Sequence, residues 1–217
     1  MKNLFFVFVL MLAVLSGFAQ GKNEVSITHY IFPDFVNAKV IFKAGMPIDT
    51  KMNYNSILQE MIYSDKGKLM AMDNLQLVDT VLLEGRKFIP VDKVFYEVLI
   101  DGDIALCAQY TCSIIPPGQP AAYGGTSQTS AVTNYSSLNS GGQLYELTLP
   151  TDYKLKPACL YWIKKNGEYY RAYNLNQFPK VFPEKASEIK AWTKKYKPDY
   201  KNQGDILKLF RFCMNGQ

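Results

Sequence analysis

Turns that contain glycine divide the chain between Met52 and Tyr110 into a series of short, apolar-rich segments. Short segments separated by two or three turn residues are typical of antiparallel strands, because parallel strands need long crossover connections. The sequence therefore predicts a meander, a sheet in which each strand pairs with the one before it. Its predicted strands are residues 57–63, 68–72, 78–83, 86–91, 94–100 and 103–111.

The dipeptide Asp101-Gly102 predicts the register of one hairpin. Asp-Gly is favoured in two-residue type I′ loops, whose central residues both need positive φ. Glu84-Gly85 and Lys66-Gly67 predict similar turns. The loop at Lys66-Gly67 would have two residues, or three if it includes Asp65. The Asp101-Gly102 turn would align Ile100 with Asp103, Leu99 with Ile104, Val98 with Ala105 and Tyr96 with Cys107.

Composition is that of an ordinary globular protein. Of 217 residues, 48% are hydrophobic and 20% charged, which is enough to build one buried core. The 24 basic and 19 acidic residues give a net charge of +5 that is spread along the chain, apart from one cluster near the C-terminus. This mild excess predicts no nucleic-acid partner.

The N-terminus has the pattern of a secretory signal peptide. Lys2 precedes an apolar run over residues 4–15, and Gly17-Phe18-Ala19 forms a small-x-small cleavage site, so the mature chain would begin at Gln20. The run is shorter than the roughly 20 residues that span a bilayer. We predict a secreted or periplasmic protein that is not integral to the membrane once residues 1–19 are removed; an uncleaved anchor is the alternative.

Four cysteines would then lie in a compartment that permits disulfides. Cys107 and Cys112 cannot pair if they share one continuous strand, because five residues place them roughly 16 Å apart. Each would have to pair with Cys159 or Cys213. Free, buried cysteines that pack as small hydrophobes are the alternative.

Residues 114–143 predict a long loop between the meander of residues 20–113 and a closing segment of residues 144–217 in the same domain. No charged residue occurs from Ile104 to Tyr145, and such a stretch has too little apolar area to offset its ordering entropy. It is either a mobile surface loop that tolerates changes of sequence or a recognition loop, in which Tyr123 and Tyr135 supply contact area. Without charges, its partner would be a glycan or a protein.

A strand over residues 144–149 and a hairpin at Asn166-Gly167, the strongest short-range hairpin signal, follow the loop. The hairpin register sets Trp162 opposite Arg171, a pair suited to a cation–π contact. One hairpin face, Tyr161, Ile163, Tyr170 and Ala172, is predicted to join the core. The other face includes Trp162, Tyr169 and Arg171, and is either a sugar-stacking platform or a surface that packs on C-terminal helices.

The C-terminal residues change to helical spacing. Phe178, Val181, Phe182, Ile189, Trp192 and Tyr196 form one apolar stripe, interrupted at Pro183, which suits a first helical turn. Ile206, Leu209, Phe210 and Cys213 form a second stripe that begins near Asn202 or Asp205. We predict an α+β fold, in which two C-terminal helices pack on a large antiparallel sheet that can curve strongly.

Several strand motifs and the tail resemble exported bacterial β-rich proteins of unknown function. The resemblance covers most of the mature chain and implies export and a β-rich fold, with no activity attached. Its motifs are Asn53-Tyr54-Asn55, Val78-Asp79-Thr80-Val81, Arg86-Lys87-Phe88-Ile89-Pro90-Val91, Phe95-Tyr96-Glu97-Val98-Leu99 and the helix from Phe182-Pro183-Glu184 to Tyr196.

No catalytic, metal-binding or cofactor motif is present. His29 is the only histidine, and its predicted role is a structural one on an early strand. We therefore predict an exported, non-enzymatic binding protein of the cell envelope that contacts an unknown protein or glycan through Trp162, Tyr169 and Arg171 or through the uncharged loop. The alternative is a periplasmic carrier that holds an apolar ligand in a half-barrel sheet.

Overall fold

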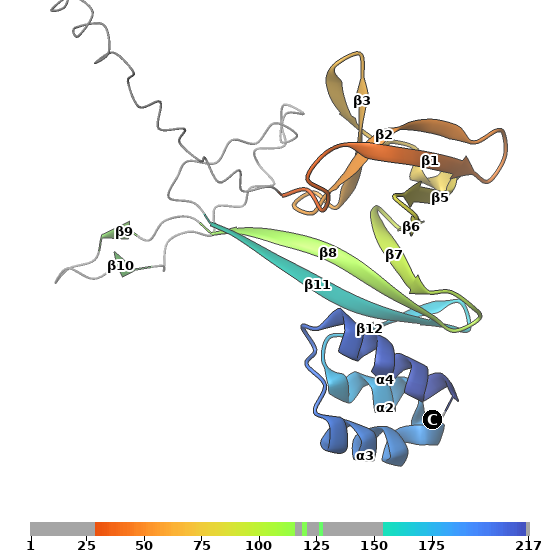
Figure 1. Ribbon diagram of the computed structural model, residues 1–217, viewed down its shortest axis with the longest axis vertical. Helices are drawn as coiled ribbons and strands as arrows, with labels where there is room; N and C mark the ends of the chain where they lie inside the picture. Colours follow the sequence, from red (N-terminus) through yellow and green to blue (C-terminus); the bar gives the residue numbers. More distant parts are fainter. Residues whose placement is uncertain (1–28, 116–118, 121–125, 128–153, 216–217) are drawn as a thin grey trace, which may run out of the picture.

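The computed structural model describes residues 29–115, 119–120, 126–127 and 154–215 (Figure 1). The predicted signal peptide at 1–19 and the predicted strand at 144–149 lie outside the described residues, as does most of the uncharged loop. Of that loop, β9 (Gln119–Pro120) and β10 (Thr126–Ser127) pair as a small ladder.

Ten strands form one antiparallel sheet, so the predicted α+β class is confirmed. Their order across the sheet is β12-β11-β8-β7-β6-β5-β1-β2-β3-β4. The bounds are β1 Val36–Phe42, β2 Ile48–Asn55, β3 Glu60–Asp65, β4 Lys68–Ala71, β5 Val78–Leu83, β6 Arg86–Val91, β7 Val94–Ile100, β8 Ala105–Ile115, β11 Lys154–Lys165 and β12 Glu168–Ala172.

One strand adjacency differs from the prediction. β5 pairs with β1 rather than with β4, because the chain returns across the sheet through a short 3₁₀ turn, η1 (Leu75–Leu77). In this register Val40 lies opposite Val81. Pairing of two apolar strands far apart in sequence therefore joins the meander β1–β4 to the meander that begins at β5.

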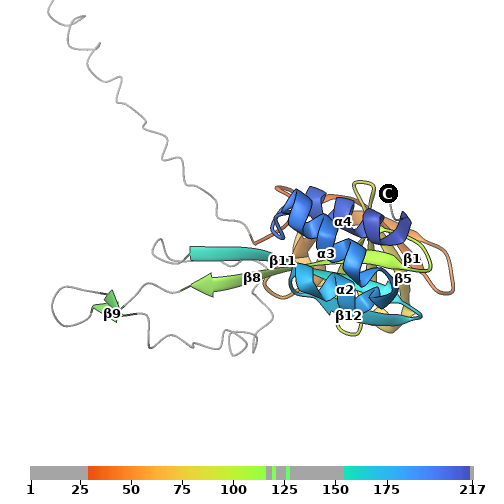
Figure 2. The same ribbon diagram turned by 90° about the horizontal axis from the view of Figure 1, so that it is seen from below.

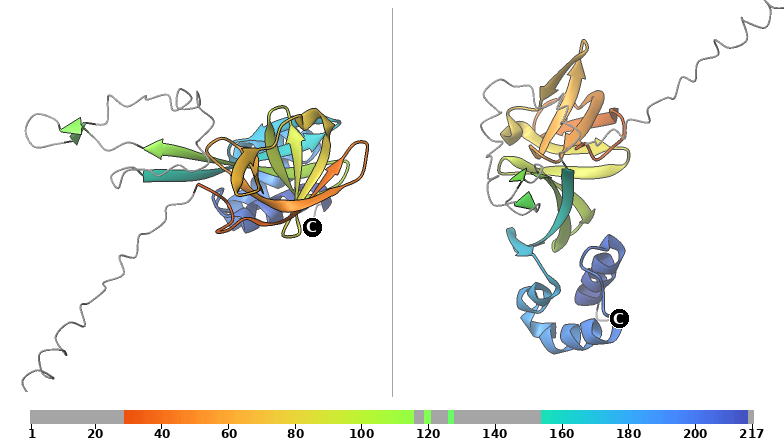
Figure 3. Two further views of the ribbon diagram at one scale, coloured as in Figure 1. Left: turned by 90° about the horizontal axis from the view of Figure 1, so that it is seen from above. Right: turned by 90° about the vertical axis from the view of Figure 1, so that its left-hand side faces the viewer.

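The sheet curls strongly, and one of its faces serves two cores (Figures 1 and 3). In the curled half that face turns inward, and a first core forms from Ala38, Val40, Met52, Tyr54, Met61, Val78, Val81, Leu83, Phe88 and Phe95. In the other half, helices cover it with a second core, which includes Leu106, Ala108, Tyr161, Ile163 and Ala172 from the strands.

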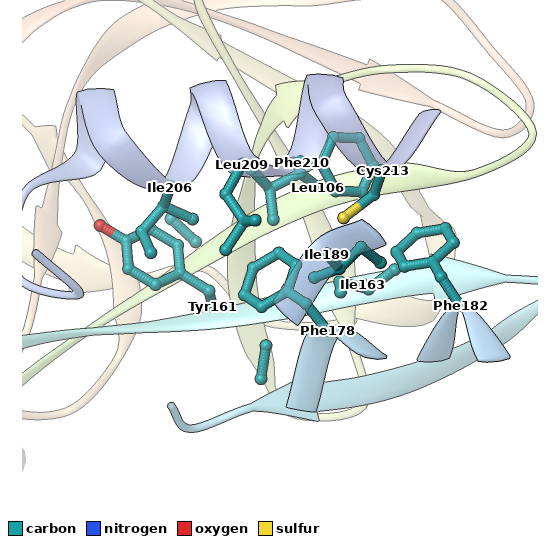
Figure 4. Packing of buried hydrophobic residues seen from close by; sticks show 12 residues of the cluster. Leu106, Tyr161, Ile163, Phe178, Phe182, Ile189, Ile206, Leu209, Phe210 and Cys213 are labelled. Atoms are coloured by element: carbon teal, nitrogen blue, oxygen red, sulfur yellow. The ribbon is translucent and has the colours of Figure 1, made fainter. Parts of the chain in front are cut away.

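Three helices make up this cover: α2 (Phe178–Val181), α3 (Ala186–Tyr196) and α4 (Gln203–Asn215). Figures 2 and 4 show them against β8, β11 and β12, with Phe178, Ile189 and Phe210 directed into the shared core. The first predicted stripe is divided because Pro183 opens a separate 3₁₀ turn, η6 (Pro183–Lys185). No helix in the described part of the chain is long and apolar enough to cross a membrane.

The start of α4 confirms the predicted cap. Oδ1 of Asn202 accepts hydrogen bonds from the backbone nitrogens of Gly204 at 2.9 Å and Asp205 at 3.3 Å. These bonds satisfy donors that have no partner inside the helix.

Three hairpin turns have the predicted conformation. Both central residues have positive φ in Glu84-Gly85 (45° and 76°), Lys66-Gly67 (48° and 79°) and Asn166-Gly167 (56° and 82°). Asp65 pairs with Lys68, so the three-residue alternative for the Lys66-Gly67 turn is wrong. At Asn166-Gly167, Trp162 lies opposite Arg171 as predicted.

The register predicted from Asp101-Gly102 is wrong. Cys107 lies opposite Val98, two residues from the predicted partner, and Leu106 lies opposite Ile100, three residues from the predicted partner, because the register shifts between these pairs across an irregular, longer loop. The Asp101 carboxylate stabilises this loop, because it accepts a hydrogen bond from the Gly102 nitrogen at 3.0 Å and pairs with Lys87 at 2.6 Å. The two-residue shift at Val98 keeps the side chains of that pair on their predicted face, because successive residues of a strand alternate between faces.

The third strand begins later than predicted. Residues 56–59 form a turn, because the Asn55 side chain accepts hydrogen bonds from the nitrogens of Ile57 at 3.0 Å and Leu58 at 3.1 Å. Tyr170 was predicted in the core but is 38% exposed, because β12 is the edge strand and the helices do not reach this residue.

The Asn166-Gly167 turn gives a first testable prediction. Replacing Gly167 with alanine should lower the free energy of unfolding by about 1 kcal/mol, because φ of 82° is costly for a residue with a Cβ atom. Urea denaturation would measure the change, and Asn166→Gly is the control, because glycine tolerates the φ of 56° at that position. A neutral Gly167→Ala variant would show that the turn conformation is wrong.

Candidate functional site

A cavity of about 540 Å³ with both polar and apolar lining residues lies where the two cores meet. Its walls come from the segment before β1, the end of β2, the strands β6, β7, β8 and β11, and the start of α4. The lining residues are Tyr30, Ile31, Ser56, Arg86, Glu97, Tyr110, Thr111, Pro157, Ala158, Cys159 and Gln203. Both ends of the described chain are therefore needed to complete the cavity.

Strand register places two opposite charges on the inward face of the sheet. Phe88 lies opposite Glu97, and Arg86 lies two residues from Phe88 on the same strand. Because side chains alternate between faces, Arg86, Phe88 and Glu97 share one face, with the two charged residues diagonal to each other.

Arg86 and Glu97 form a two-point ion pair. Nε of Arg86 donates to Oε1 of Glu97 at 2.7 Å, and Nη2 donates to Oε2 at 2.6 Å. The Tyr110 hydroxyl donates to Oε2 at 2.5 Å. Glu97 is only 6% exposed, so its carboxylate is buried with three donors, which is the arrangement that makes a buried charge tolerable.

Three aromatic rings surround the guanidinium. Its central carbon lies 5.1 Å from the ring centre of Phe32, 5.4 Å from that of Phe88 and 5.3 Å from that of Tyr110. Such contacts are attractive because the faces of aromatic rings carry partial negative charge. The rings, the ion pair and the hydroxyl therefore form one connected group, which we call the Arg86 cluster: Arg86, Glu97, Tyr110, Phe32 and Phe88.

Two members of the cluster, Arg86 and Tyr110, have raised pKa values. Burial opposes the charge on Arg86, but the hydrogen bonds and attraction of Glu97 outweigh it and raise the arginine pKa. Burial, and then the hydrogen bond to Glu97, raise the pKa of Tyr110, so this hydroxyl stays protonated and donates. The cluster is accordingly a neutral unit with set geometry.

Hydrogen bonds to backbone carbonyl groups connect the curled half of the sheet to β8 beside the cavity. The Tyr54 hydroxyl donates to the carbonyl oxygen of Tyr110 at 3.0 Å, and the Cys112 nitrogen donates to the Ser56 carbonyl at 2.8 Å. The Ser56 hydroxyl donates to the His29 carbonyl at 2.5 Å. His29 is buried beside an isolated β-bridge of Tyr30 with Asn55, which agrees with a structural role, and burial lowers its pKa.

Three of the sequence-predicted site residues, Trp162, Tyr169 and Arg171, lie on the outward face, away from the cavity. Trp162 stacks on Tyr96 with ring centres 5.3 Å apart, and Tyr169 meets Tyr96 edge-on at 5.7 Å. The predicted packing of this face on the helices is wrong, because the helices cover the opposite face with Tyr161 and Ile163.

The predicted cation–π contact between Trp162 and Arg171 is not seen among the described residues. Trp162 instead donates from Nε1 to the Gln109 side chain at 2.8 Å, and the strand register puts Gln109 on the same outward face. Arg171 is exposed. Tyr123 and Tyr135, the loop residues predicted to bind, lie outside the described residues.

The four cysteines are free. Cys107 and Cys112 share the continuous strand β8, as predicted, and do not pair. Burial raises the pKa of Cys107 to about 12, of Cys159 to about 11 and of Cys213 to about 12, and it raises that of Cys112 as well. Within the described ranges, no three histidine, cysteine or acidic side chains group as metal ligands.

Sequence reasoning missed the Arg86 cluster, although one signal was present. Glu97 sits between Phe95 and Leu99 in the alternating pattern, at a position where a buried apolar residue is expected. A charge at such a position needs a buried partner. Comparison with protein-family models, with curated proteins and with solved structures finds no match to this chain, so the resemblance to exported β-rich proteins stays a prediction.

Proposed function

We propose that the protein is an exported binding protein of the cell envelope, and that the cavity beside the Arg86 cluster holds a small, uncharged, polar ligand such as one or two sugar units. The observation that carries this proposal is the cavity itself. Its volume of about 540 Å³ falls within the range of about 300–1,000 Å³ that is usual for small-molecule sites.

The charges around the cavity favour an uncharged ligand. Arg86 and Glu97 neutralise each other at 2.6 Å, so an ionic ligand would find no unpaired countercharge in the pair. Hydrogen-bonding capacity remains, however. Nη1 of Arg86 and the amide of Gln203 make no hydrogen bond with a described side chain or backbone group.

Aromatic faces complete the match to a sugar. Tyr30 and Tyr110 line the cavity together with the Gln203 amide. A sugar offers hydroxyl groups at its edge and C–H groups on its face, which suit amide and guanidinium donors on one side and aromatic rings on the other. This class agrees with a glycan partner predicted from the uncharged loop.

The apolar-carrier alternative receives less support. Tyr54, Met61 and Phe88 are fully buried inside the curled sheet, and the cavity of about 430 Å³ beside Met52 is smaller than the one beside the Arg86 cluster. A lipid in that position would have to displace these side chains. Native mass spectrometry of the gently purified protein would detect a co-purifying lipid, which would favour the carrier over the proposed function.

Calorimetric titration with neutral disaccharides (maltose, lactose, cellobiose and N,N′-diacetylchitobiose) tests the proposal. Gln203→Trp should weaken binding of the sugar that binds the wild type by at least about tenfold, or 1.4 kcal/mol, because Gln203 lines the cavity and the larger indole would take up part of its volume. Gln76→Trp, an exposed position in η1, is the matched control and should bind as the wild type does. The proposal fails if no sugar in the panel binds, or if both variants bind equally well.

A further inference from the structure

The positive charge of the protein is concentrated in its helical tail. Residues 178–217 carry nine basic and four acidic side chains, whereas residues 1–177 carry fifteen of each. The net charge of +5 is therefore the charge of this tail. α3 lies at the end of the molecule farthest from the curled strands (Figures 1 and 3), so its outer face is turned away from the sheet.

Four exposed lysines lie on α3 or directly after its last residue: Lys190, Lys194, Lys195 and Lys197. None of them forms an ion pair with any residue that the structure describes. Ser187 and Ala191, two small exposed residues, lie on the same side of the helix as Lys190, Lys194 and Lys195, and Glu188 is the acidic residue of α3. We call Lys190, Lys194, Lys195 and Lys197, together with the exposed Tyr196, the α3 face.

One exposed aromatic ring borders the lysines. Tyr196 is 56% exposed, whereas its neighbour Trp192 is half-buried and stacks on Phe212 of α4 with ring centres 5.6 Å apart. Nζ of Lys195 lies 5.0 Å from the centre of the Tyr196 ring. Tryptophan and tyrosine concentrate at the boundary between lipid headgroups and acyl chains, and lysine stems extend from that boundary toward the phosphates. The α3 face combines both residue types.

We propose that the α3 face docks on an anionic phospholipid surface. Charge complementarity and the aromatic border argue for this partner. The tail has eight lysines and one arginine. Lysine acts as a point charge and suits a diffuse sheet of phosphates, whereas site-specific phosphate recognition in nucleic acids favours the forked arginine side chain. This inference is independent of the proposed sugar site, which lies at the junction of the two cores.

Vesicle co-sedimentation tests the docking. The wild type should bind vesicles of equimolar phosphatidylglycerol and phosphatidylcholine, should not bind pure phosphatidylcholine, and should lose binding as salt is raised. The triple variant Lys190→Gln, Lys194→Gln, Lys195→Gln should bind on the order of 100-fold more weakly, because each lysine near an anionic surface contributes roughly fivefold. The control triple variant Lys43→Gln, Lys51→Gln, Lys68→Gln removes the same charge from exposed positions on the curled half and should lose less than about threefold.

A second measurement locates the contact. In a Trp162→Phe, Trp192→Phe background, Tyr196→Trp places the chain's one tryptophan at the exposed position on the α3 face, and brominated phosphatidylglycerol vesicles should quench its emission. Equal loss of binding in both triple variants, absence of quenching, or no binding to anionic vesicles would each overturn the proposal. Binding to duplex DNA that exceeds vesicle binding and is lost in the α3 triple variant would also overturn it, because it would assign the face to nucleic acid.

Discussion

Replacing Glu97 with glutamine should lower the free energy of unfolding by about 2–4 kcal/mol, because the half-buried Arg86 charge would lose its paired carboxylate. Truncating one partner of a fully buried pair costs about 3–5 kcal/mol, and the 31% exposure of the Arg86 side chain reduces the expected effect. Arg86→Met should be similarly destabilising, since it leaves the Glu97 carboxylate with only the Tyr110 hydroxyl. Urea denaturation of each variant gives the values.

A double-mutant cycle separates the pair from its surroundings. The double variant Arg86→Met with Glu97→Gln should be less destabilised than the sum of the single variants, with a coupling of about 2 kcal/mol. The matched control is Lys87 on β6 with Asp101 directly after β7, a pair that is just as short at 2.6 Å but more exposed. Its coupling should stay below about 1 kcal/mol. Equal couplings for the two pairs would mean that Arg86 and Glu97 are not buried together.

Replacing Phe210 with alanine should lower the free energy of unfolding by about 3–5 kcal/mol, because the phenyl ring is fully buried between α4 and the sheet. The ring meets Phe182 edge-on with centres 6.2 Å apart, so the variant also loses an aromatic contact. Chemical denaturation followed by far-ultraviolet circular dichroism would measure the change.

Tyr173→Ala is the control for this core prediction, because Tyr173 is 54% exposed and its removal should cost less than about 1 kcal/mol. Both cores share one face of one sheet, so the Phe210→Ala variant should still unfold in a single transition by fluorescence and by circular dichroism. A loss below 1 kcal/mol, or two separate transitions, would contradict the packing of the helices on this face.

Local chemistry explains what the sequence predicts well. Asn166-Gly167 and Glu84-Gly85 specify turns through the φ angles of two adjacent residues, and strands β5, β6 and β7 have their predicted bounds. Asp101-Gly102 is the exception, since Asp101 uses its carboxylate for Lys87 and for the Gly102 nitrogen. A side-chain contact of this kind is invisible to a rule about turn dipeptides.

Features that depend on distant parts of the chain could not be predicted in the same way. The pairing of β1 with β5 joins segments separated by three strands, and the cavity needs Tyr30 and Gln203 from opposite ends of the described chain. The two faces of the β11–β12 hairpin are both aromatic, so sequence alone did not decide between Tyr161 and Trp162 as the face beneath the helices. Tertiary packing decided it.

The central claim is that the cavity beside the Arg86 cluster binds an uncharged sugar, and a crystal structure of the protein soaked with the tightest-binding disaccharide tests it most directly. The account predicts electron density for a sugar ring against Tyr110 and within hydrogen-bonding distance of Arg86 or Gln203. Density on the outward face at Trp162 and Tyr169, with the cavity free of sugar, would contradict it.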